Sequence, residues 1–287
     1  MQRMELTQSQ PRYGSLLQTG RLIRRWRESL WQMLTIPLLA FIAIPIVAIF
    51  LGLTPEAIWR SLQMPQAVQA IRLSALTSLI TVGVSVAFGT PVAYLLYRKR
   101  SRFHQLLDTL IDLPTVLPPA VAGVALLMAF GRAAPLGRLL AELGIQLPFS
   151  TAAVVLAQTF IAAPLYIKSA ALGFAGVGCE IRRAAALDGA NRWQVFRYIV
   201  LPISWQSLLS GCVLTWSRAM GEFGATIIFA GNLPGRTQTM PLAIYLGLEV
   251  DLNTALSLSA ILVIFSFTIL LLLKAVLHQR ADEDLVE

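Results

Sequence analysis

The sequence predicts an all-α membrane protein with six transmembrane helices. Of its 287 residues, 56% are hydrophobic and only 13% are charged, whereas a soluble domain usually has about a quarter charged residues. The hydrophobic residues gather in runs close to the roughly 20 residues that a helix needs to cross a bilayer. The predicted spans are residues 34–53, 73–97, 107–131, 151–174, 203–230 and 254–277.

The basic residues gather on one side of the predicted membrane. The net charge is +8, and 16 of the 23 Lys and Arg residues fall in segments that six alternating spans place on one face. These are Arg3, Arg12, Arg21, Arg24, Arg25, Arg27, Arg98, Lys99, Arg100, Arg102, Arg182, Arg183, Arg192, Arg197, Lys274 and Arg280; the opposite face holds Arg60, Arg132, Arg138 and Arg236. Because cytoplasmic loops carry the excess of positive charge, both termini are expected in the cytoplasm. The charge therefore indicates topology rather than binding of nucleic acid.

This topology divides the chain into three parts. Residues 1–32 are expected to form a cytoplasmic N-terminal arm, residues 33–277 the transmembrane domain, and residues 278–287 a cytoplasmic tail. The first span follows a long polar arm and is too long for the core of a signal peptide, so it is expected to act as an uncleaved insertion signal in the cell (inner) membrane.

The sequence argues against an enzyme, a metal site or a cofactor. Cys179 and Cys212 predict no disulfide framework, and the two histidines lie far apart in the chain. Asp108 and Asp112 form a close carboxylate pair near the cytoplasmic face, which we interpret as the solvated start of a helix. None of the three lysines follows a G-x-x-x-x-G loop, so the sequence has no phosphate-binding P-loop.

Prolines interrupt the third predicted span. Pro114, Pro118 and Pro119 cannot donate backbone hydrogen bonds, so the helix should kink or break there. In hydrocarbon, freed carbonyls are tolerated only inside the protein or along a watery cavity. Two interpretations stay open, a packing kink and a role in lining a gate. Of the two larger external loops, 132–149 could hold a short surface helix, and 231–251 has turn residues followed by an amphipathic turn.

The longest cytoplasmic loop, residues 176–202, predicts two short helices with Gly189 between them. One side of the first helix would carry the small and apolar residues Ala184, Ala185, Leu187 and Ala190, with Trp193. A second helical piece would run over 192–200 and stop at Pro202. Such a pair would form a rigid knob on the inner face, suited to docking a partner.

The fifth predicted span contains two charges. Arg218 and Glu222 are four positions apart and would lie within reach on one helical face. Charges inside a membrane usually pair and face the bundle interior or a cavity. The pair could lock the helix into the bundle, or it could face a translocation pathway where Arg218 briefly attracts an anion. Small residues around the pair are expected to allow close packing and bending: a stripe of Ser217, Gly221 and Ala225, with Gly224 beside it.

The loop at 176–202 resembles the coupling loop of the membrane subunits of ATP-binding-cassette importers. That loop has paired alanines, then a glycine, then a hydrophobic-x-Leu-Pro ending. The matching residues here are Ala184, Ala185 and Gly189, followed by Ile199, Val200, Leu201 and Pro202. The family usually has a glutamate before the alanines, where this sequence has Arg182 and Arg183 and the nearest acid is Glu180.

The resemblance covers about residues 73–267 and implies the type I ABC importer permease fold. It also implies the partners of such a permease. Two copies of the permease would pair in the lipid membrane, two cytoplasmic ATPase subunits would grip the coupling loops, and an external binding protein would deliver the solute. The lack of a P-loop agrees, because ATP hydrolysis would then belong to the partner subunits.

A second stretch resembles the oxyanion branch of these importers. The run SRAMGEFGAT…GNLPGRTQTMPLAIY over residues 217–245 and the segment LPTVLPPAVAG over 113–123 are most similar to molybdate/tungstate permeases. From the proline and charge arguments above, the candidates for lining the pathway or for locking the bundle are Pro118, Pro119, Arg218, Gly221, Glu222 and Gly224. A sulfate/thiosulfate permease remains the alternative, and an ion-coupled carrier working without ATP is a more distant one.

Overall fold

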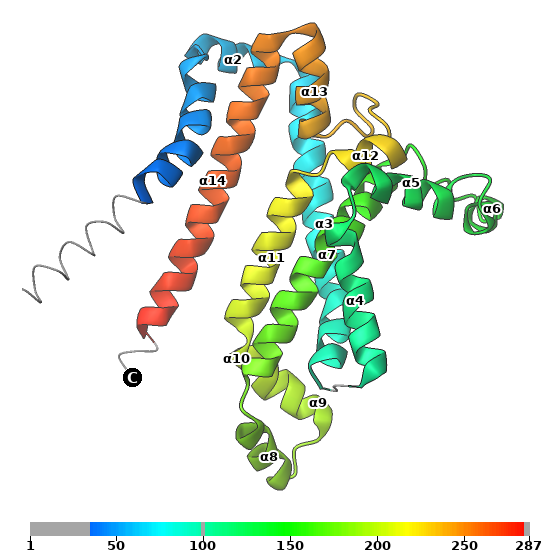
Figure 1. Ribbon diagram of the computed structural model, residues 1–287, viewed down its shortest axis with the longest axis vertical. Helices are drawn as coiled ribbons and strands as arrows, with labels where there is room; N and C mark the ends of the chain where they lie inside the picture. The colour runs from blue at the N-terminus through cyan, green and yellow to red at the C-terminus, as the bar shows by residue number, and fades with distance from the viewer. Residues whose placement is uncertain (1–34, 99–100, 284–287) are drawn as a thin grey trace, which may run out of the picture. The chain divides into compact units, whose positions relative to one another are not determined.

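The computed structural model describes residues 35–98 and 101–283, and every regular element in these ranges is helical (Figure 1). The predicted all-α class is therefore confirmed for the described residues. The predicted arm 1–32 and residues 284–287 of the predicted tail lie outside them. Contacts divide the chain into two units, residues 1–52 and 53–287, which are described separately. In the first unit, the described residues form one helix, Thr35–Leu51, at the first predicted span.

The second unit contains the remaining helices. In order these are α2 (Pro55–Gln63), α3 (Pro65–Arg98), α4 (Arg102–Val116), α5 (Pro119–Phe130), α6 (Pro135–Glu142), α7 (Thr151–Gly176), α8 (Cys179–Leu187), α9 (Arg192–Val195), the π-helical turn η1 (Phe196–Val200), α10 (Leu201–Ile203), α11 (Trp205–Met220), α12 (Gly224–Phe229), α13 (Met240–Val250) and α14 (Leu252–Glu283). Helix α6 confirms the short helix expected in 132–149, whereas the turn expected in 231–251 is the 11-residue helix α13.

Three of the described helices are long and apolar enough to cross a membrane without interruption. They are Pro65–Tyr97, Thr151–Gly176 and Leu252–Leu272, and the number rises to six if each of three bent helix pairs is counted as one span. Two predicted spans are not single helices. The span at 107–131 divides into α4 and α5, and the span at 203–230 divides into α11 and α12.

Helices α3 and α7 pack together along a face of small polar residues. The buried side chains of α3 include Ser74, Thr77, Ser78, Thr81 and Ser85. Their hydroxyl groups are largely satisfied locally or across the interface, as when Ser85 Oγ donates to the carbonyl of Thr81 at 2.7 Å and Thr81 Oγ1 donates to Gln158 Oε1 of α7 at 3.1 Å. Small side chains of this kind let two helix backbones approach closely in a membrane protein.

Two apolar clusters lie at different levels of α7. The first joins α7 to α5 and α12, with Ala122, Val154, Ala225 and Phe229 among its buried members. The second joins the other end of α7 to the end of α3 and to the loop that follows α7, through residues such as Ala93, Tyr166, Phe174, Val195 and Val200. Helix α7 thus anchors both the broken helices and the segment α8–η1 (Figure 1).

The loop between α12 and α13 is packed inside the second unit. Thr237, Gln238 and Thr239 are buried. The backbone N–H of Met240 donates to Ser74 Oγ of α3 at 2.7 Å, and Thr151 Oγ1 of α7 donates to the carbonyl of Arg236 at 2.9 Å. This loop belongs to the segment 217–245, whose sequence resembles oxyanion permeases. It is therefore fixed to α3 and α7 instead of projecting freely.

Candidate translocation site and coupling loop

The first break in a predicted span lies between α4 and α5. Helix α4 ends with the backbone N–H of Leu117 bonded to the carbonyl of Leu113, and α5 starts at Pro119 with a bend of 115° between the two helices. Pro118 and Pro119 have no backbone N–H, so neither can continue the hydrogen-bond ladder. The prolines at 118 and 119 thus break the helix as predicted, whereas Pro114 stays inside α4.

The second break lies between α11 and α12, and Glu222 organises it. Helix α11 ends at Met220. Arg218 Nη1 donates to Glu222 Oε2 at 2.7 Å, and the backbone N–H of Ala225, in the first turn of α12, donates to Glu222 Oε1 at 2.8 Å. The Glu222 side chain is 1% exposed and that of Arg218 is 36% exposed. One buried carboxylate therefore neutralises Arg218 and satisfies an otherwise unpaired N–H of α12.

This geometry corrects two expectations about the fifth span. The ion pair is confirmed, but Arg218 and Glu222 do not share a helix, because the chain leaves α11 before Glu222. The expected stripe of Ser217, Gly221 and Ala225 is wrong for the same reason. A Cβ atom built on Gly221 would meet nothing closer than 3.7 Å, the carbonyl oxygen of its own helix at Ser217.

The two breaks contact each other, and glycines make that contact possible. A Cβ atom on Gly224 would lie 2.6 Å from Cβ of Pro119, and one on Gly123 of α5 would lie 2.8 Å from Cβ of Ile228 of α12. Real Cβ atoms essentially never approach so closely. At these two glycines, therefore, the chain has no room for a further side-chain atom. The structure brings Pro119 together with Gly224, although about a hundred residues separate them in the sequence.

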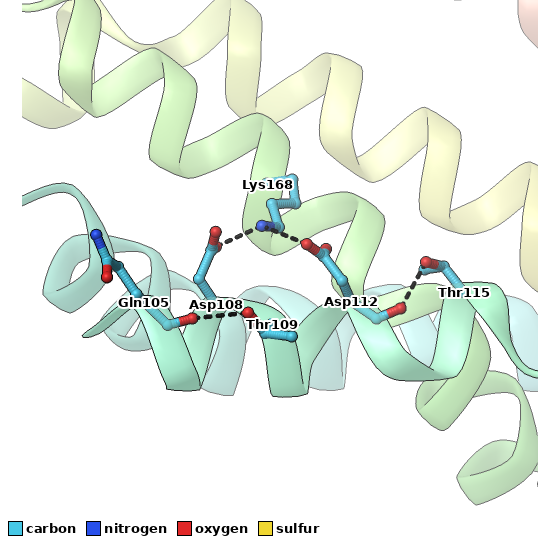
Figure 2. Close-up of polar contacts among 6 residues, drawn as sticks. All are labelled: Gln105, Asp108, Thr109, Asp112, Thr115 and Lys168. Carbon is cyan, nitrogen blue, oxygen red and sulfur yellow. Dashed lines mark hydrogen bonds and ion pairs between the residues drawn. The ribbon is translucent and has the colours of Figure 1, made fainter. Parts of the chain in front are cut away.

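A second charged cluster, the Lys168 clasp, joins α4 to α7 (Figure 2). We define the clasp as Lys168, Asp108 and Asp112. The ammonium group of Lys168 donates to Asp108 Oδ1 and lies 2.9 Å from Asp112 Oδ2. The interpretation of the two aspartates as a helix start is wrong, because α4 begins at Arg102 and has no acidic residue in its first turn. Their carboxylates are partly exposed, as expected, but both face one cation from another helix. The sequence feature that could have predicted the clasp is Lys168 itself, which lies within the fourth predicted span, because charges inside spans are usually paired.

The predicted coupling loop folds as two short helical pieces on either side of Gly189. Gly189 has a φ angle of +89°, a left-handed conformation that a residue with a Cβ atom adopts only at a cost. Asn191 begins the second piece with a capping box, in which the Asn191 side chain accepts from the N–H of Gln194 and the Gln194 side chain accepts from the N–H of Asn191. The predicted division at Gly189 is confirmed.

The second piece does not stop at Pro202 as predicted. It continues through the π-helical turn η1 into α10 and breaks at Ser204. In η1 the backbone N–H of Leu201 bonds to the carbonyl of Phe196, five residues back. A π turn widens the helix locally, which lets the chain pass Pro202 without the clash that a proline makes in a regular α-helix.

The small and apolar residues of the loop do not form one face, contrary to prediction. Ala185 and Ala190 pack against the buried cluster around Phe174 and Val195. Leu187 and Trp193 instead point outward, with 88% and 67% of their surface exposed, and Ala184 is exposed as well. The loop therefore has an inner side that fastens it to α7 and an outer side with large uncovered apolar groups.

Arg182, at the place where the resembling loops have a glutamate, holds α8 to the end of the bundle. Its guanidinium carbon lies 5.3 Å from the ring centre of Tyr97, and its Nη1 donates to the carbonyl of Phe174 at 3.5 Å. Together with Arg192 it lines a pocket of about 320 Å³ between the end of α3 and the loop. The departure from the family pattern thus has a structural role in positioning the loop.

Comparison with known proteins agrees with this architecture. Residues 82–282 match the family model described as "Binding-protein-dependent transport system inner membrane component". The chain is 40% identical over 233 residues to the "Molybdenum transport system permease protein ModB" of Mycobacterium tuberculosis, covering 81% of this chain and 88% of that protein. It is 37% identical over 246 residues to the "Sulfate transport system permease protein CysW" of Escherichia coli K12, covering 83% of each chain.

The fold also resembles solved transporters. A chain from the crystal structure of "a bacterial ABC transporter involved in the import of the acidic polysaccharide alginate" superposes with a TM-score of 0.69 at 16% identity, covering 91% of this chain and 98% of that one. The protein is thus a permease subunit with the type I ABC importer fold. It belongs to the family of inner-membrane components of binding-protein-dependent transport systems.

The close approach of the two breaks predicts different outcomes for two neighbouring glycines. Gly224→Ala should lower stability by about 1–3 kcal/mol, because its Cβ atom would overlap Pro119. Gly221→Ala is the matched control and should change stability far less, since its Cβ atom has room. Thermal unfolding of the purified proteins in one detergent measures both. Equal losses in the two variants would contradict the packing described here.

The double role of the Glu222 carboxylate predicts that Glu222→Gln is costly. The variant keeps the shape of the side chain but leaves Arg218 without its ionic partner, which should cost about 1.5–3 kcal/mol of stability. Adding Arg218→Met to Glu222→Gln should recover part of this loss, because no unpaired charge then remains. The measurement is the same unfolding transition for both variants and the parent. A double variant no more stable than Glu222→Gln alone would argue against the ion pair as the cause.

Proposed function

We propose that this chain is the membrane-spanning subunit of an ATP-driven importer that translocates an oxyanion, molybdate or tungstate. The observation that carries the proposal is the 40% identity to a protein named as a molybdenum transport permease, over 81% of this chain. The segment over residues 217–245 adds support, because its oxyanion-type sequence forms the second helix break and the buried loop after α12. Substrate choice would reside largely in an external binding protein.

Sulfate is the second candidate substrate. The specific observation in its favour is the 37% identity to a sulfate permease over 83% of both chains. Molybdate and sulfate are both tetrahedral dianions, so a pathway suited to one would admit the other. The two candidates differ in subunit composition, since a molybdate permease is expected to pair with itself and a sulfate permease with a different permease.

The coupling loop supplies the docking surface in this proposal. Two cytoplasmic ATPase subunits would contact its outer side, where Leu187 and Trp193 are exposed. Ala184, Ala185, Gly189 and Ala190 would shape the loop, and the ending at Leu201 and Pro202 would connect it to α11. This chain would not hydrolyse ATP itself, because the sequence has no P-loop lysine.

The membrane topology would place both termini and the coupling loop on one side. The coupling loop at 176–202, the arm 1–32 and the tail 278–287 would face the cytoplasm, with residues 33–277 in the lipid membrane. The external binding protein would then dock at the opposite end. Two copies of the chain would enclose the pathway between them.

The helix breaks would lie along the pathway. Discontinuous helices mark the substrate region in many transporters, because irregular backbone at membrane depth is tolerated where it is buried or faces a watery cavity. Pro118, Pro119, Gly221 and Gly224 would supply this irregular backbone. Arg218, neutralised by Glu222, would offer hydrogen-bond donors without the net charge that traps a dianion.

Uptake of molybdenum tests the substrate. In a strain lacking this chain, grown at low molybdate with excess sulfate, cell-associated molybdenum measured by mass spectrometry should fall severalfold. The intact gene should restore it, and sulfate should not compete. Normal molybdenum together with reduced sulfur uptake would instead assign the chain to sulfate transport.

The conformation of Gly189 predicts the effect of a change in the coupling loop. Gly189→Asp would place a side chain at a φ angle of +89° and should distort the loop, so that less ATPase co-purifies with the permease. Gly176→Ala at the end of α7 is the matched control, because its Cβ atom would meet nothing within 4 Å and its φ angle is not positive. Full co-purification and full ATPase stimulation with Gly189→Asp would show that this loop does not dock the ATPase.

A further inference from the structure

Helix α4 is held less firmly than the helix that follows it. None of the 15 residues of α4 is buried. In α5, by contrast, Ala122, Gly123 and Leu126 are buried, and Gly123 lies tightly against α12. Helix α5 is therefore fixed in the core, while α4 lies on the surface of the described unit.

The Lys168 clasp is the charged contact that attaches α4 to α7. The side chains of Lys168, Asp108 and Asp112 are 33%, 49% and 45% exposed. Lys168 and Asp108 line a groove of about 510 Å³ together with His104 and Gln105 of α4. The three charged groups are thus partly exposed, and a partly exposed ion pair is easier to separate than a buried one. The Arg218–Glu222 pair is different, since Glu222 is 1% exposed and also bonds to backbone.

The join between α4 and α5 has the features of a hinge. No described hydrogen bond of a helical ladder crosses from α4 into α5, because Pro118 and Pro119 lack a backbone N–H. The N–H of Leu117 ends one ladder and the carbonyl of Pro118 starts the next. Rotation about the backbone of Leu117 would change the direction of α4 and leave both ladders intact. Hinges in proteins are commonly a few residues of this kind at the end of an element.

We infer that Lys168 is a positioning residue for transport: its clasp holds α4 on α7 in the conformation seen here and opens once in each transport cycle, as α4 turns about Leu117 and Pro118. The inference rests on the proposed function, because a transport cycle requires ATPase subunits and a transported solute. Because two carboxylates share the Lys168 ammonium group, the clasp can also open in two steps. Asp112 and Asp108 are one helical turn apart, so Lys168 can keep one carboxylate while it leaves the other.

Distances between spin labels test the movement directly. Labels would be placed at Gln105 of α4 and Leu172 of α7, which line the same groove while the clasp stays intact. Cys179 and Cys212 are first replaced by serine. In the complete transporter in lipid vesicles, the label distance should shift by about 5 Å or more, one helical turn, between the nucleotide-free and the vanadate-trapped states. A control pair at Val124 of α5 and Ala152 of α7 should stay constant, because α5 is fixed in the core.

Charge variants test whether the clasp controls the cycle. In the absence of the binding protein, Lys168→Met should raise the rate of ATP hydrolysis severalfold. It should also lower the amount of oxyanion transported per ATP hydrolysed. Asp108→Asn or Asp112→Asn alone should have a smaller effect, since one carboxylate remains. The exchanged pair, Lys168→Asp with Asp112→Lys, should restore the coupling. If the clasp were purely structural, Lys168→Met would instead lower ATP hydrolysis, transport and the yield of complex together.

Failure of the clasp mechanism and failure of the proposed function would give different results. A complex that hydrolyses ATP and imports oxyanion with an unchanged Gln105–Leu172 label distance would overturn the clasp mechanism alone. A complex that imports no oxyanion, or that imports it without any ATPase, would overturn the proposed function. Equal movement of the control pair would also count against a hinge at Leu117 and Pro118, because the motion would then involve α5 as well.

Discussion

The packing of the two helix breaks against each other is the constraint on which the rest of this fold depends. Backbone groups inside a membrane have no water to bond with, so each break must be closed by protein. Pro118 and Pro119 reduce the number of donors that need a partner, and the Glu222 carboxylate takes up one N–H of α12. The missing side chain of Gly224 then lets Pro119 fit against it. With both breaks closed, α5 and α12 can join α7 in one apolar cluster.

The two charged clusters show how burial determines what an ion pair can do. The Arg218–Glu222 pair links two residues that are four positions apart, one at the end of α11 and one in the segment between α11 and α12. The Glu222 carboxylate bonds to a backbone N–H as well as to Arg218. Separating such a pair would leave a buried charge unpaired, which is strongly unfavourable. The Lys168 clasp links two helices through half-exposed groups. The first arrangement therefore fixes local backbone, whereas the second permits exchange of partners.

Sequence reasoning found the helical class, the division of the loop 176–202 at Gly189 and the break at Pro118 and Pro119, because hydropathy, glycine and proline chemistry are local. It failed where tertiary contacts decide. A period of four placed Arg218 and Glu222 on one helix, but the capping bond to Ala225 favours a break. It assigned Asp108 and Asp112 to solvent, since nothing local reveals that Lys168 faces them from α7. The outward direction of Leu187 could not be inferred either, because Ala185 and Ala190 take the inner side through contacts with a distant aromatic cluster.

Helix α7 connects these features by continuous packing. At one end, Phe174 lies in an aromatic cluster with Tyr94 of α3 and Phe196 of the coupling loop, at ring separations of 6.1 and 5.9 Å. Further along is Lys168 with its two carboxylates, and beyond it the cluster that holds α5 and α12. Close-packed interiors deform little, so a displacement of the coupling loop would tend to carry α7 with it. The clasp to α4 is made by partly exposed charged groups instead of close-packed apolar side chains, so we expect such a displacement to separate the clasp before it disturbs the apolar clusters.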